Sequence, residues 1–466
     1  MRIAILGGGP GGYSAAFEAS RLGAEVVLVE RERLGGTCLN RGCVPTKAIL
    51  RSAQVAADAR QASELGLVAT TPSVDLPALR TRKESIVDEL VSQLEDAARR
   101  SKVHLVTGDG RLRDARSIEV TLATGGTEII HADAIILATG SVVLQLPGID
   151  HDLEGVWTSD DAVSVTAIPN EIVIIGGGVI GLEFAWAYAA FGAKVAVVEL
   201  TEQVLPGNDR RVARATQRSL ERMGVEFFLG DAVESVAPEK GAMRSTLRSG
   251  RVLVSDVVLS AVGRVPDGTG HGFEEAGVQF DRRAVKVDQH LRTSVPGVYA
   301  AGDLIGGMML AHVADEEGAV AARNAVSELA ARTTGEPPPL ESVRYDCIPA
   351  CVYTTPNIAT VGMTRDAATA AGVDAVQAIS KYTGNAKALA EGEADGFVQV
   401  TAERETGRLL GCQVVGPHAV ETIHEVALAM RYGITVRQVA DTVHAHPTAS
   451  EAIKAACRDA ADKCGR

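Results

Sequence analysis

The sequence is short of basic residues. Lysine and arginine number 46 against 59 acidic residues, which leaves a formal net charge of −13 over 466 residues. Because such a chain repels polyanions, we expect neither nucleic acid nor an anionic membrane surface as its main partner. Aromatic residues make up only 4%, but an apolar fraction of 46% is that of an ordinary globular protein of two to four domains.

Long uninterrupted apolar stretches are also missing. The most apolar region, residues 172–191, is broken by glycines and carries Glu183 near its middle. It therefore predicts a buried strand and helix rather than a membrane span. The first twelve residues, MRIAILGGGPGG, have an apolar core too short for a signal peptide. We expect a soluble protein without a membrane partner.

Cysteine is scarce, with seven residues in the whole chain. This odd, low count is unlike a disulfide-stapled secreted domain and predicts a reducing, cytoplasmic location. In such a compartment a close pair of cysteines is more often catalytic or metal-binding than structural. The sequence around Cys347, Cys351 and Cys412 predicts core positions, and Cys457 and Cys464 are too far apart to favour a second redox pair.

One cysteine pair stands out in the stretch GGTCLNRGCVPTK, where four residues separate Cys38 from Cys43. An extended chain would set them roughly 16 Å apart, whereas a disulfide needs Cα atoms within about 7 Å. The surrounding glycines predict a turn, and the residues from Ala48 onward predict a helix. Spacing alone leaves open whether the pair braces the chain or is opened and closed.

Two stretches, residues 1–30 and 171–199, repeat the order strand, glycine turn, helix, strand at an offset of 169 residues. Backbone N–H groups at such a helix start suit a pyrophosphate, and an acid ending the second strand suits ribose hydroxyls. The repeat therefore predicts two dinucleotide sites. Their residues are Gly7, Gly9, Gly12 and Glu30 in the first copy, and Gly176, Gly178, Gly181 and Glu199 in the second.

The second site favours NAD over NADP. No lysine or arginine occurs between Glu199 and Arg210, and a carboxylate would repel a 2′-phosphate. Farther along, the run TTGEPPPL is the clearest linker, and the strands followed by helices beyond it predict a separate α+β domain.

Taken together, these motifs resemble those of the flavoprotein (pyridine nucleotide) disulfide oxidoreductases, and in particular of their dihydrolipoamide dehydrogenase branch. The resemblance implies an α/β fold with two Rossmann-like dinucleotide-binding domains, for FAD and NAD, and a C-terminal α+β dimerisation domain. The implied limits are 1–145 for the FAD domain with its redox disulfide, 146–264 for the NAD domain, 265–334 for a segment completing the FAD domain, and 335–466 for dimerisation. The motifs in family order are GGGPGGY, GGTCLNRGCVPTK, ATGS, GGGVIGLE, AVGRVPD, AAGD, MLAHVADEEG, VYTTP and HAHPTASE.

The same resemblance assigns roles to single residues. Cys43 would be the thiol nearest the flavin, and Cys38 the outer thiol that exchanges with substrate. Lys47 and Glu183 match an ion pair beside the flavin. Glu30 would bind the adenosine ribose of FAD and Asp303 would lie near its ribityl chain, while Gly140 and Gly263 belong to cofactor-binding turns.

An exchanging thiol needs a proton acceptor near neutral pH, for which histidine is suited. The motif HAHPTASE offers His444 and His446, with Glu451 following. Alone, an exposed His-x-His is more often structural or a weak metal site. The resemblance implies instead that His446 and Glu451 act across a twofold dimer interface on the other subunit's cysteines, and we expect no metal.

The implied activity is oxidation of protein-bound dihydrolipoyl groups with reduction of NAD⁺. The partner would be a lipoyl-bearing protein of a 2-oxo acid dehydrogenase or glycine cleavage complex. A NAD(P)H-dependent reductase of another disulfide or of Hg²⁺ is the alternative within the family, and a non-catalytic flavoprotein subunit is the alternative outside enzymes. Arg41, between the cysteines, departs from the small apolar residue of many relatives, and either tunes the thiols or is a solvated side chain.

Overall fold

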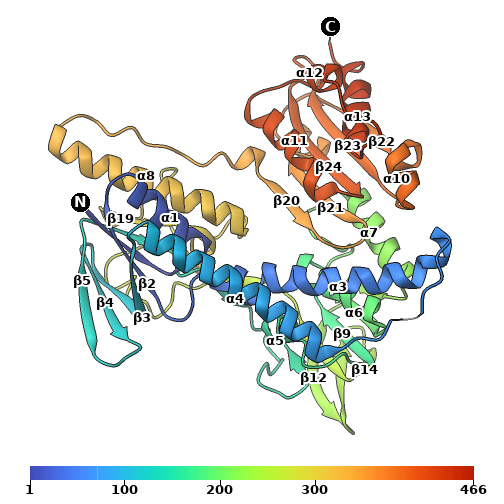
Figure 1. Cartoon of the computed structure of the whole chain (residues 1–466), viewed down its shortest axis with the longest axis horizontal. Coiled ribbons are helices and arrows are strands. Elements are labelled where there is room, and N and C mark those ends of the chain that lie inside the picture. Colours follow the sequence, from blue (N-terminus) through green and yellow to red (C-terminus); the bar gives the residue numbers. More distant parts are fainter. Residues whose placement is uncertain (71, 466) are drawn as a thin grey trace. The chain divides into compact units, whose positions relative to one another are not determined.

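The computed structural model describes residues 1–70 and 72–465. The chain forms two compact units, each assembled from stretches that are distant in sequence (Figure 1). Unit 1 comprises Met1–Ala48, Pro77–Leu144 and Gly263–Val343, and unit 2 comprises Ile49–Leu76, Gln145–Val262 and Arg344–Arg466. The four-part domain division given above remains a prediction.

Unit 1 is built on a seven-stranded sheet in which five parallel strands continue into an antiparallel hairpin. The central strands are almost wholly apolar, as expected of strands that are buried on both faces. In sheet order the strands are β19 (Val298–Ala300), β6 (Ala134–Leu137), β1 (Arg2–Leu6), β2 (Glu25–Glu30), β3 (His104–Asp114), β4 (Ser117–Leu122) and β5 (Thr127–His131).

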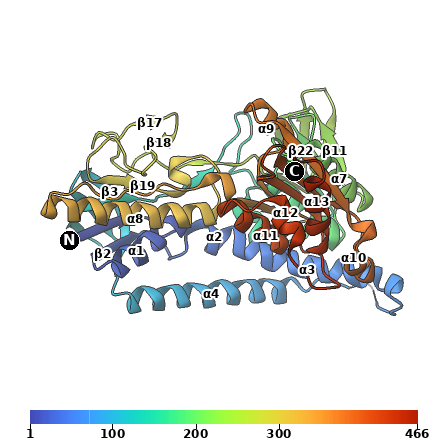
Figure 2. The ribbon, with the colours of Figure 1, turned by 90° about the horizontal axis from the view of Figure 1, so that it is seen from above.

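Two helices of unit 1, α1 (Pro10–Arg21) and α8 (Ala311–Thr334), pack against each other, and both views show them side by side (Figures 1 and 2). Their contact is close because Gly318 of α8 faces Gly11 of α1. A Cβ added at Gly318 would lie 2.0 Å from the Gly11 oxygen. The buried Glu317 of α8 accepts a hydrogen bond from the N–H of Gly302 at 2.8 Å. This bond ties α8 to the short 3-10 turn η2 (Gly302–Ile305).

The remaining elements of unit 1 include the long helix α4 (Leu76–Arg100), whose first residue falls in unit 2. Two further antiparallel strand pairs are β7 (Ser141–Val143) with β16 (Arg264–Pro266), which are far apart in sequence, and the short hairpin of β17 (Phe280–Asp281) with β18 (Ala284–Val285). Around the cysteines lie α2 (Gly36–Arg41) and the start of α3 (Cys43–Gln61); the rest of α3, from Ile49 on, and the following 3-10 turn η1 (Ala62–Leu65) are counted in unit 2.

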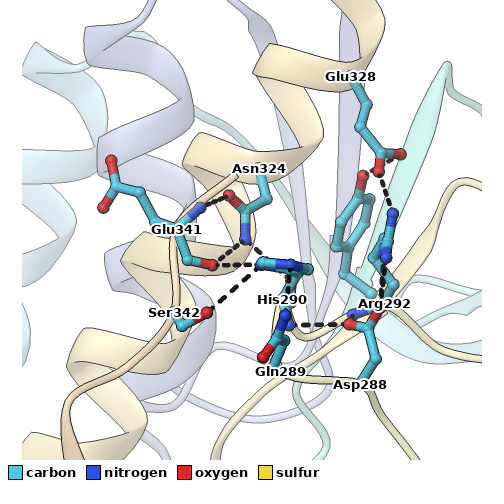
Figure 3. A network of polar contacts seen from close by, with 9 residues as sticks. Asp288, Gln289, His290, Arg292, Asn324, Glu328, Glu341 and Ser342 are labelled. Carbon is cyan, nitrogen blue, oxygen red and sulfur yellow. Dashed lines mark hydrogen bonds and ion pairs between the residues drawn. The ribbon is translucent and has the colours of Figure 1, made fainter. Parts of the chain in front are cut away.

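The exit of the proline-rich linker is fixed in unit 1 by the side chain of Asn324, which is fully buried (Figure 3). Its Nδ2 donates to the carbonyl oxygens of His290 and Glu341 at 2.9 and 3.0 Å, and its Oδ1 accepts from the Glu341 N–H at 2.8 Å. Nδ1 of His290 is 2.9 Å from the same Glu341 oxygen. Asn324 thus pairs with the linker backbone as a neighbouring strand would.

Unit 2 contains the second parallel sheet, which repeats the register of the first. Ile5 lies opposite Leu28 in unit 1, and Ile174 lies opposite Val197 in unit 2, so both partners are displaced by 169 residues. In sheet order the strands are β11 (Glu226–Leu229), β10 (Lys194–Glu199), β9 (Glu171–Ile175), β15 (Val257–Ser260) and β8 (Val156–Trp157). The accompanying elements are α5 (Ser159–Ser164), α6 (Val179–Phe191), α7 (Arg210–Arg222) and the antiparallel strands β12 (Val233–Glu239), β13 (Ala242–Leu247) and β14 (Val252–Ser255).

The C-terminal part of unit 2 is a five-stranded antiparallel sheet covered by α11 (Ala419–Arg431) and α13 (Glu451–Ala461). It is the predicted α+β domain, and with the two parallel sheets it confirms the predicted fold class. The strands in sheet order are β20 (Pro349–Val352), β21 (Asn357–Gly362), β24 (Leu409–Gly416), β23 (Phe397–Glu403) and β22 (Ala375–Lys381), and the smaller helices are α9 (Arg365–Ala370), α10 (Ala386–Glu391), α12 (Val436–Asp441), η3 (Tyr345–Cys347) and η4 (Tyr382–Gly384).

The remaining cysteines divide into two groups. Cys412 and Cys457 are fully buried in the core of the C-terminal sheet. Cys347 lies in η3 and is only partly buried, so the prediction of a core position was wrong for Cys347, whereas Cys351 lies in β20 and is also partly buried. Among the described residues, no helix combines the length and apolar character needed to cross a membrane.

Candidate active site

The two cysteines lie on either side of a break between helices. Cys38 is in α2, and Cys43 is the first residue of α3. Gly42 makes the break, because a Cβ there would lie 2.9 Å from the Thr37 oxygen. Helix α3 therefore begins at Cys43, five residues before Ala48, where the sequence predicted the start of a helix. This places Cys43 where backbone N–H groups and the helix dipole favour a thiolate.

The side chains of Cys38 and Cys43 are hydrogen-bonded to each other, so the turn brings the pair together. This bond, followed by burial, raises the pKa of the Cys38 thiol far above its usual range, while the charge of Lys47 opposes the rise. Because two adjacent thiols cannot both ionise easily, the reduced pair carries no more than one negative charge. Cys38 is the member that keeps its proton.

Two further residues lie near the pair: Tyr13, which was assigned no role from the sequence, and Arg41, which either tunes the thiols or is a solvated side chain. The pKa of Tyr13, on α1, is raised to about 12, first by burial, then by Asp315, and further by the charges of Cys38 and Cys43. Tyr13 therefore lies near the pair and stays a neutral phenol. Arg41 forms an ion pair with Glu32, and both side chains are well exposed.

The first glycine turn has the geometry of a dinucleotide loop. Gly7 has φ of +104°, and a Cβ on Gly12 would lie 1.8 Å from the Gly7 oxygen, so both positions require glycine for the fold itself. A Cβ on Gly9, the N-cap of α1, would meet only the Gly36 Cα at 3.8 Å. Glu30 accepts the N–H of Gly8 through Oε2 at 2.7 Å.

The second glycine turn reproduces these features in unit 2. Gly176 has φ of +106°, and a Cβ on Gly181 would lie 2.0 Å from the Gly176 oxygen. A Cβ on Gly178 would have no heavy atom within 4 Å. Glu199 accepts the Gly177 N–H at 2.7 Å and is held by Thr201 through its other oxygen at 2.8 and 2.9 Å.

Asp303 lies in η2 and accepts the hydroxyl of Ser141 through Oδ2 at 2.6 Å. Arg264 donates to the same hydroxyl at 2.8 Å and reaches Thr37, the neighbour of Cys38, at 3.3 Å. Arg264 and Ser141 were missed as site residues, although both stand in quoted motifs. The turns at Gly140 and Gly263 have φ of +80° and +109°, and an added Cβ at either would meet nothing within 4 Å.

The histidine and acid of the C-terminal motif form a dyad in unit 2. Nδ1 of His446 lies 3.0 and 3.2 Å from the two carboxylate oxygens of Glu451, the first residue of α13. The pKa of Glu451 lies below its usual value. The main cause is the hydrogen bond from the Thr448 N–H, and the next is the hydrogen bond with His446. The His446 side chain is 70% exposed, so its Nε2 is open to solvent and a base toward an incoming proton donor.

The predicted Lys47–Glu183 ion pair joins residues of different units and remains a prediction. Lys47 follows Cys43 by one helical turn on α3. Glu183 is buried on α6, 3% exposed, and accepts the Tyr353 N–H at 3.1 Å within unit 2. Among the described residues, no group of three or more histidine, cysteine or acidic side chains is arranged to hold a metal ion.

Comparison with known proteins finds matches along most of the chain. Residues 1–318 match the family described as pyridine nucleotide-disulphide oxidoreductase. Residues 348–457 match the dimerisation domain of that family.

Similar sequences span nearly the full length of both partners. A dihydrolipoyl dehydrogenase of Haloferax volcanii is 39% identical, covering 98% of this chain and 96% of the relative. A dihydrolipoyl dehydrogenase of Chlorobaculum parvum is 38% identical, covering 97% of this chain and 96% of the relative. A leghemoglobin reductase of Vigna unguiculata is also 38% identical, over 99% of this chain and 88% of its own.

Solved structures agree with the fold. LpdA of Mycobacterium tuberculosis superposes with a TM-score of 0.91 at 31% identity, covering 98% of this chain and 99% of its own. The HOCl-induced flavoprotein disulfide reductase RclA of Escherichia coli, as its Cu(II) complex, gives a TM-score of 0.86 at 26% identity, with 98% of each chain covered.

Proposed function

The chain belongs to the pyridine nucleotide-disulphide oxidoreductase family, and we propose that within it the protein oxidises protein-bound dihydrolipoyl groups and reduces NAD⁺ to NADH. Its enzyme class is that of FAD- and NAD(H)-dependent disulfide oxidoreductases. The observation that carries the proposal is the hydrogen-bonded Cys38–Cys43 pair at a helix N-terminus, in a chain similar over nearly its full length to proteins named dihydrolipoyl dehydrogenase.

The residues of the first turn fit FAD. Gly7 and Gly12 are explained by chain packing, but Gly9 is not, which suits close approach of a pyrophosphate to the backbone at the start of α1. Glu30 would bind the adenosine ribose, and Asp303, positioned by Ser141, would lie near the ribityl chain. FAD supplies the electron transfer from the reduced cysteine pair to NAD⁺.

The second turn fits NAD in the same way, with Gly178 as the position that packing does not explain. Glu199 would bind the ribose hydroxyls, and its two carboxylate oxygens are already oriented by Gly177 and Thr201. Gly176, Gly181 and Gly263 would shape the loops around it. Because no basic residue stands between Glu199 and Arg210, a 2′-phosphate would find no countercharge.

The chain's own residues perform two thiol–disulfide exchanges. One dihydrolipoyl thiolate attacks Cys38 of the oxidised pair, which forms a mixed disulfide and releases Cys43 as thiolate. The second dihydrolipoyl thiol gives its proton to Nε2 of His446. It then attacks the lipoyl sulfur of the mixed disulfide, which breaks the bond to Cys38 and releases Cys38. The substrate leaves as lipoyl disulfide, and the pair holds two electrons. Lys47 favours the thiolate form, and we propose that it pairs with Glu183.

The dimerisation domain supports a homodimer, and we propose that His446 and Glu451 serve the cysteines of the other subunit. Glu451 orients the imidazole through Nδ1 and stabilises the positive charge that forms when Nε2 takes the proton. We further propose a cytoplasmic location, and as partner a lipoyl-bearing protein of a 2-oxo acid dehydrogenase or glycine cleavage complex.

Formation of NADH from NAD⁺ and dihydrolipoamide by the FAD-loaded protein tests this function. Rapid turnover in the wild type that is lost in Cys43→Ser is the expected result. A flavin-loaded protein that cannot oxidise dihydrolipoamide but consumes NADH with another disulfide or with Hg²⁺ would establish the alternative reductase instead. A protein inactive in both directions would be a non-catalytic flavoprotein subunit.

A further inference from the structure

A fully buried glutamine lies on the sheet in the C-terminal part of unit 2. Gln399, on β23, has a relative exposure of 0%. Successive residues of a strand point to opposite faces of the sheet, and Val398 and Val400 face the apolar core that the sheet shares with α13. Gln399 therefore points to the other face, where α7 packs against the sheet. Gln399 belongs to the segment that matches the dimerisation domain, and the function proposed above gives it no role.

The side-chain amide of Gln399 is hydrogen-bonded to residues at the start of α7. Its Oε1 accepts a hydrogen bond from Nη1 of Arg211 at 2.9 Å, and its Nε2 donates to Oδ2 of Asp209 at 2.9 Å. Nε2 also donates at 3.0 Å to Oε1 of Gln413, which is itself 2% exposed. A guanidinium can only donate and a carboxylate can only accept, so the amide matches both partners in this one orientation. A buried amide satisfied in this way fixes the groups that it binds.

Asp209 joins the sheet to helix α7. It is the N-cap of α7, and its Oδ1 accepts the N–H of Arg211 at 2.7 Å. Its Oδ2 accepts the hydrogen bond from Gln399. One carboxylate oxygen therefore closes the start of the helix, while the other is held by the sheet. The position of Gln399 consequently sets where the chain enters α7.

The chain that enters α7 is the loop after Glu199, the acid proposed to bind the ribose of NAD⁺. We call residues 200–208 the ribose loop. The N–H of Thr201 donates to Glu199 at 2.8 Å, and the N–H of Leu205 donates to the carbonyl oxygen of Gly177 at 2.8 Å. Gly177 stands in the second glycine turn and donates its own N–H to Glu199. The ribose loop thus contacts both parts of the proposed NAD site.

The ribose loop needs support from outside itself. Leu205 has φ of +49°, a left-handed conformation that a leucine keeps only where surrounding contacts impose it. Its carbonyl oxygen accepts the N–H of Asn208 at 3.0 Å, and Asn208 directly precedes Asp209 in the chain. A short series of hydrogen bonds and one peptide link therefore runs from Gln399 through the helix cap to the backbone of the second glycine turn.

We propose that Gln399 is a positioning residue for NAD⁺, which holds the ribose loop against the second glycine turn through the cap of α7 and so keeps Glu199 aligned for the ribose. The inference deepens the proposed function and rests on it. Gln399 touches neither NAD⁺ nor the dithiol in this account and acts only through Asp209 and the ribose loop. A side chain of the dimerisation domain would thus tune the affinity of the nucleotide site.

The test compares the two substrates of the FAD-loaded dimer. In the proposed function each substrate reacts with a different form of the enzyme, so kcat/KM for dihydrolipoamide and kcat/KM for NAD⁺ report separate half-reactions. Gln399→Leu changes the volume of the side chain little but removes all of its hydrogen bonds. We expect kcat/KM for NAD⁺ to fall about three- to tenfold and kcat/KM for dihydrolipoamide to stay unchanged. A mere loss of folded protein would lower both constants by the same factor.

Asp209→Ser retains a helix cap but has no second oxygen for Gln399, so it should lower kcat/KM for NAD⁺ as well. It makes no change in the buried sheet and decides the matter if Gln399→Leu does not fold. The double variant should lose no more than either single variant, because both break one link. Thr401→Val is the matched control, since Thr401 is fully buried on the same face of β23 and its hydroxyl has no hydrogen-bond partner among the described residues. It should keep both constants.

An unchanged kcat/KM for NAD⁺ in either single variant, or an equal fall of both constants, would overturn the inference and leave the proposed function standing. Absence of dihydrolipoamide turnover in the wild type would refute the proposed function itself. Calorimetric titration of NAD⁺ into the FAD-loaded dimer would then decide the role of Gln399. Binding weakened by about the same three- to tenfold factor in both single variants would support that role, and equal or absent binding would overturn it.

Discussion

At the scale of single residues, the dyad of unit 2 shows how a base is prepared by its neighbours. Glu451 is held by the Thr448 N–H at 3.0 Å and aligned on Nδ1 of His446. The pKa of Glu451 is lowered by these contacts, so its carboxylate is ionised at neutral pH. A carboxylate fixed in this way sets which ring nitrogen carries the proton.

Replacing Glu451 with glutamine should lower kcat for NADH formation about 100-fold, because the orienting charge is lost while the acceptor for Thr448 remains. Steady-state kinetics at several pH values measure this effect. Asp459→Asn, on the exposed side of the same helix, is the control and should keep wild-type rates. A Glu451→Gln enzyme as fast as the control would remove Glu451 from the mechanism.

Site residues that belong to a local pattern could be predicted from the sequence, and those joined only by the fold could not. Gly9, Glu30 and Cys38 stand in motifs whose spacing carries the chemistry. Arg264 touches Ser141 from 123 positions away, and no local pattern reports such a contact. The sequence pointed to them only in that Ser141 lies in the motif ATGS and Arg264 in the motif AVGRVPD.

At the scale of elements, the glycine turns separate two uses of glycine. Gly181 is needed because α6 packs directly on the preceding strand, with 2.0 Å between an added Cβ and the Gly176 oxygen. Gly178 starts the same helix, and an added Cβ there would meet nothing. The two positions therefore distinguish a packing requirement from a ligand requirement.

Gly178→Ala should leave the melting temperature unchanged and raise KM for NAD⁺ at least tenfold, since the methyl group would occupy the approach of the pyrophosphate to the backbone. Gly181→Ala should instead lower the melting temperature by several degrees, because the clash is with backbone. Thermal unfolding and NAD⁺ kinetics of the Gly178→Ala and Gly181→Ala variants measure these two effects. Equal effects of both substitutions on stability would contradict the assignment of Gly178.

The clamp of Asn324 on the linker exit is a second feature at this scale (Figure 3). Asn324→Leu removes three hydrogen bonds and leaves the Glu341 N–H and the His290 carbonyl oxygen without their Asn324 partner beside a fully buried side chain, so we expect a loss of about 2–4 kcal/mol in the free energy of unfolding. Denaturant unfolding measures it. Gln289→Ala, at the exposed edge of the network, is the control, and an Asn324→Leu protein as stable as this control would disprove the clamp.

Element types and order followed from sequence more readily than boundaries did. The offset of 169 residues predicted two matching modules, and the strand registers repeat it. The start of α3 was placed too late, because the glycines near Cys43 suggested a turn. In the structure Gly42 alone supplies the break, and α2 forms a helix on the other side of it.

At the scale of the whole molecule, the account requires two subunits for one site. Cys43→Ser and His446→Gln should each be inactive as homodimers, but co-expression should yield mixed dimers with one intact site. Random pairing would give about a quarter of wild-type activity in the mixture, half of the dimers being mixed and each holding half of the sites. An inactive mixture, with mixed dimers shown by mass, would mean that each subunit uses its own base.

The class of reaction could be predicted for the whole molecule because it depends on motifs. The partner protein could not, since a lipoyl arm presents the same dithiol whatever domain carries it. The dimer contacts that would join the cysteines to the dyad likewise have no signature in one chain.

The central claim is that Cys38 and Cys43 accept the electrons of a dithiol substrate. We would incubate the oxidised protein anaerobically with one equivalent of dihydrolipoamide and no NAD⁺, alkylate it after denaturation, and locate the new labels by mass spectrometry. We expect two new alkyl groups, on Cys38 and Cys43. Labels that appear elsewhere, or a pair that stays oxidised while the dithiol persists, would contradict it.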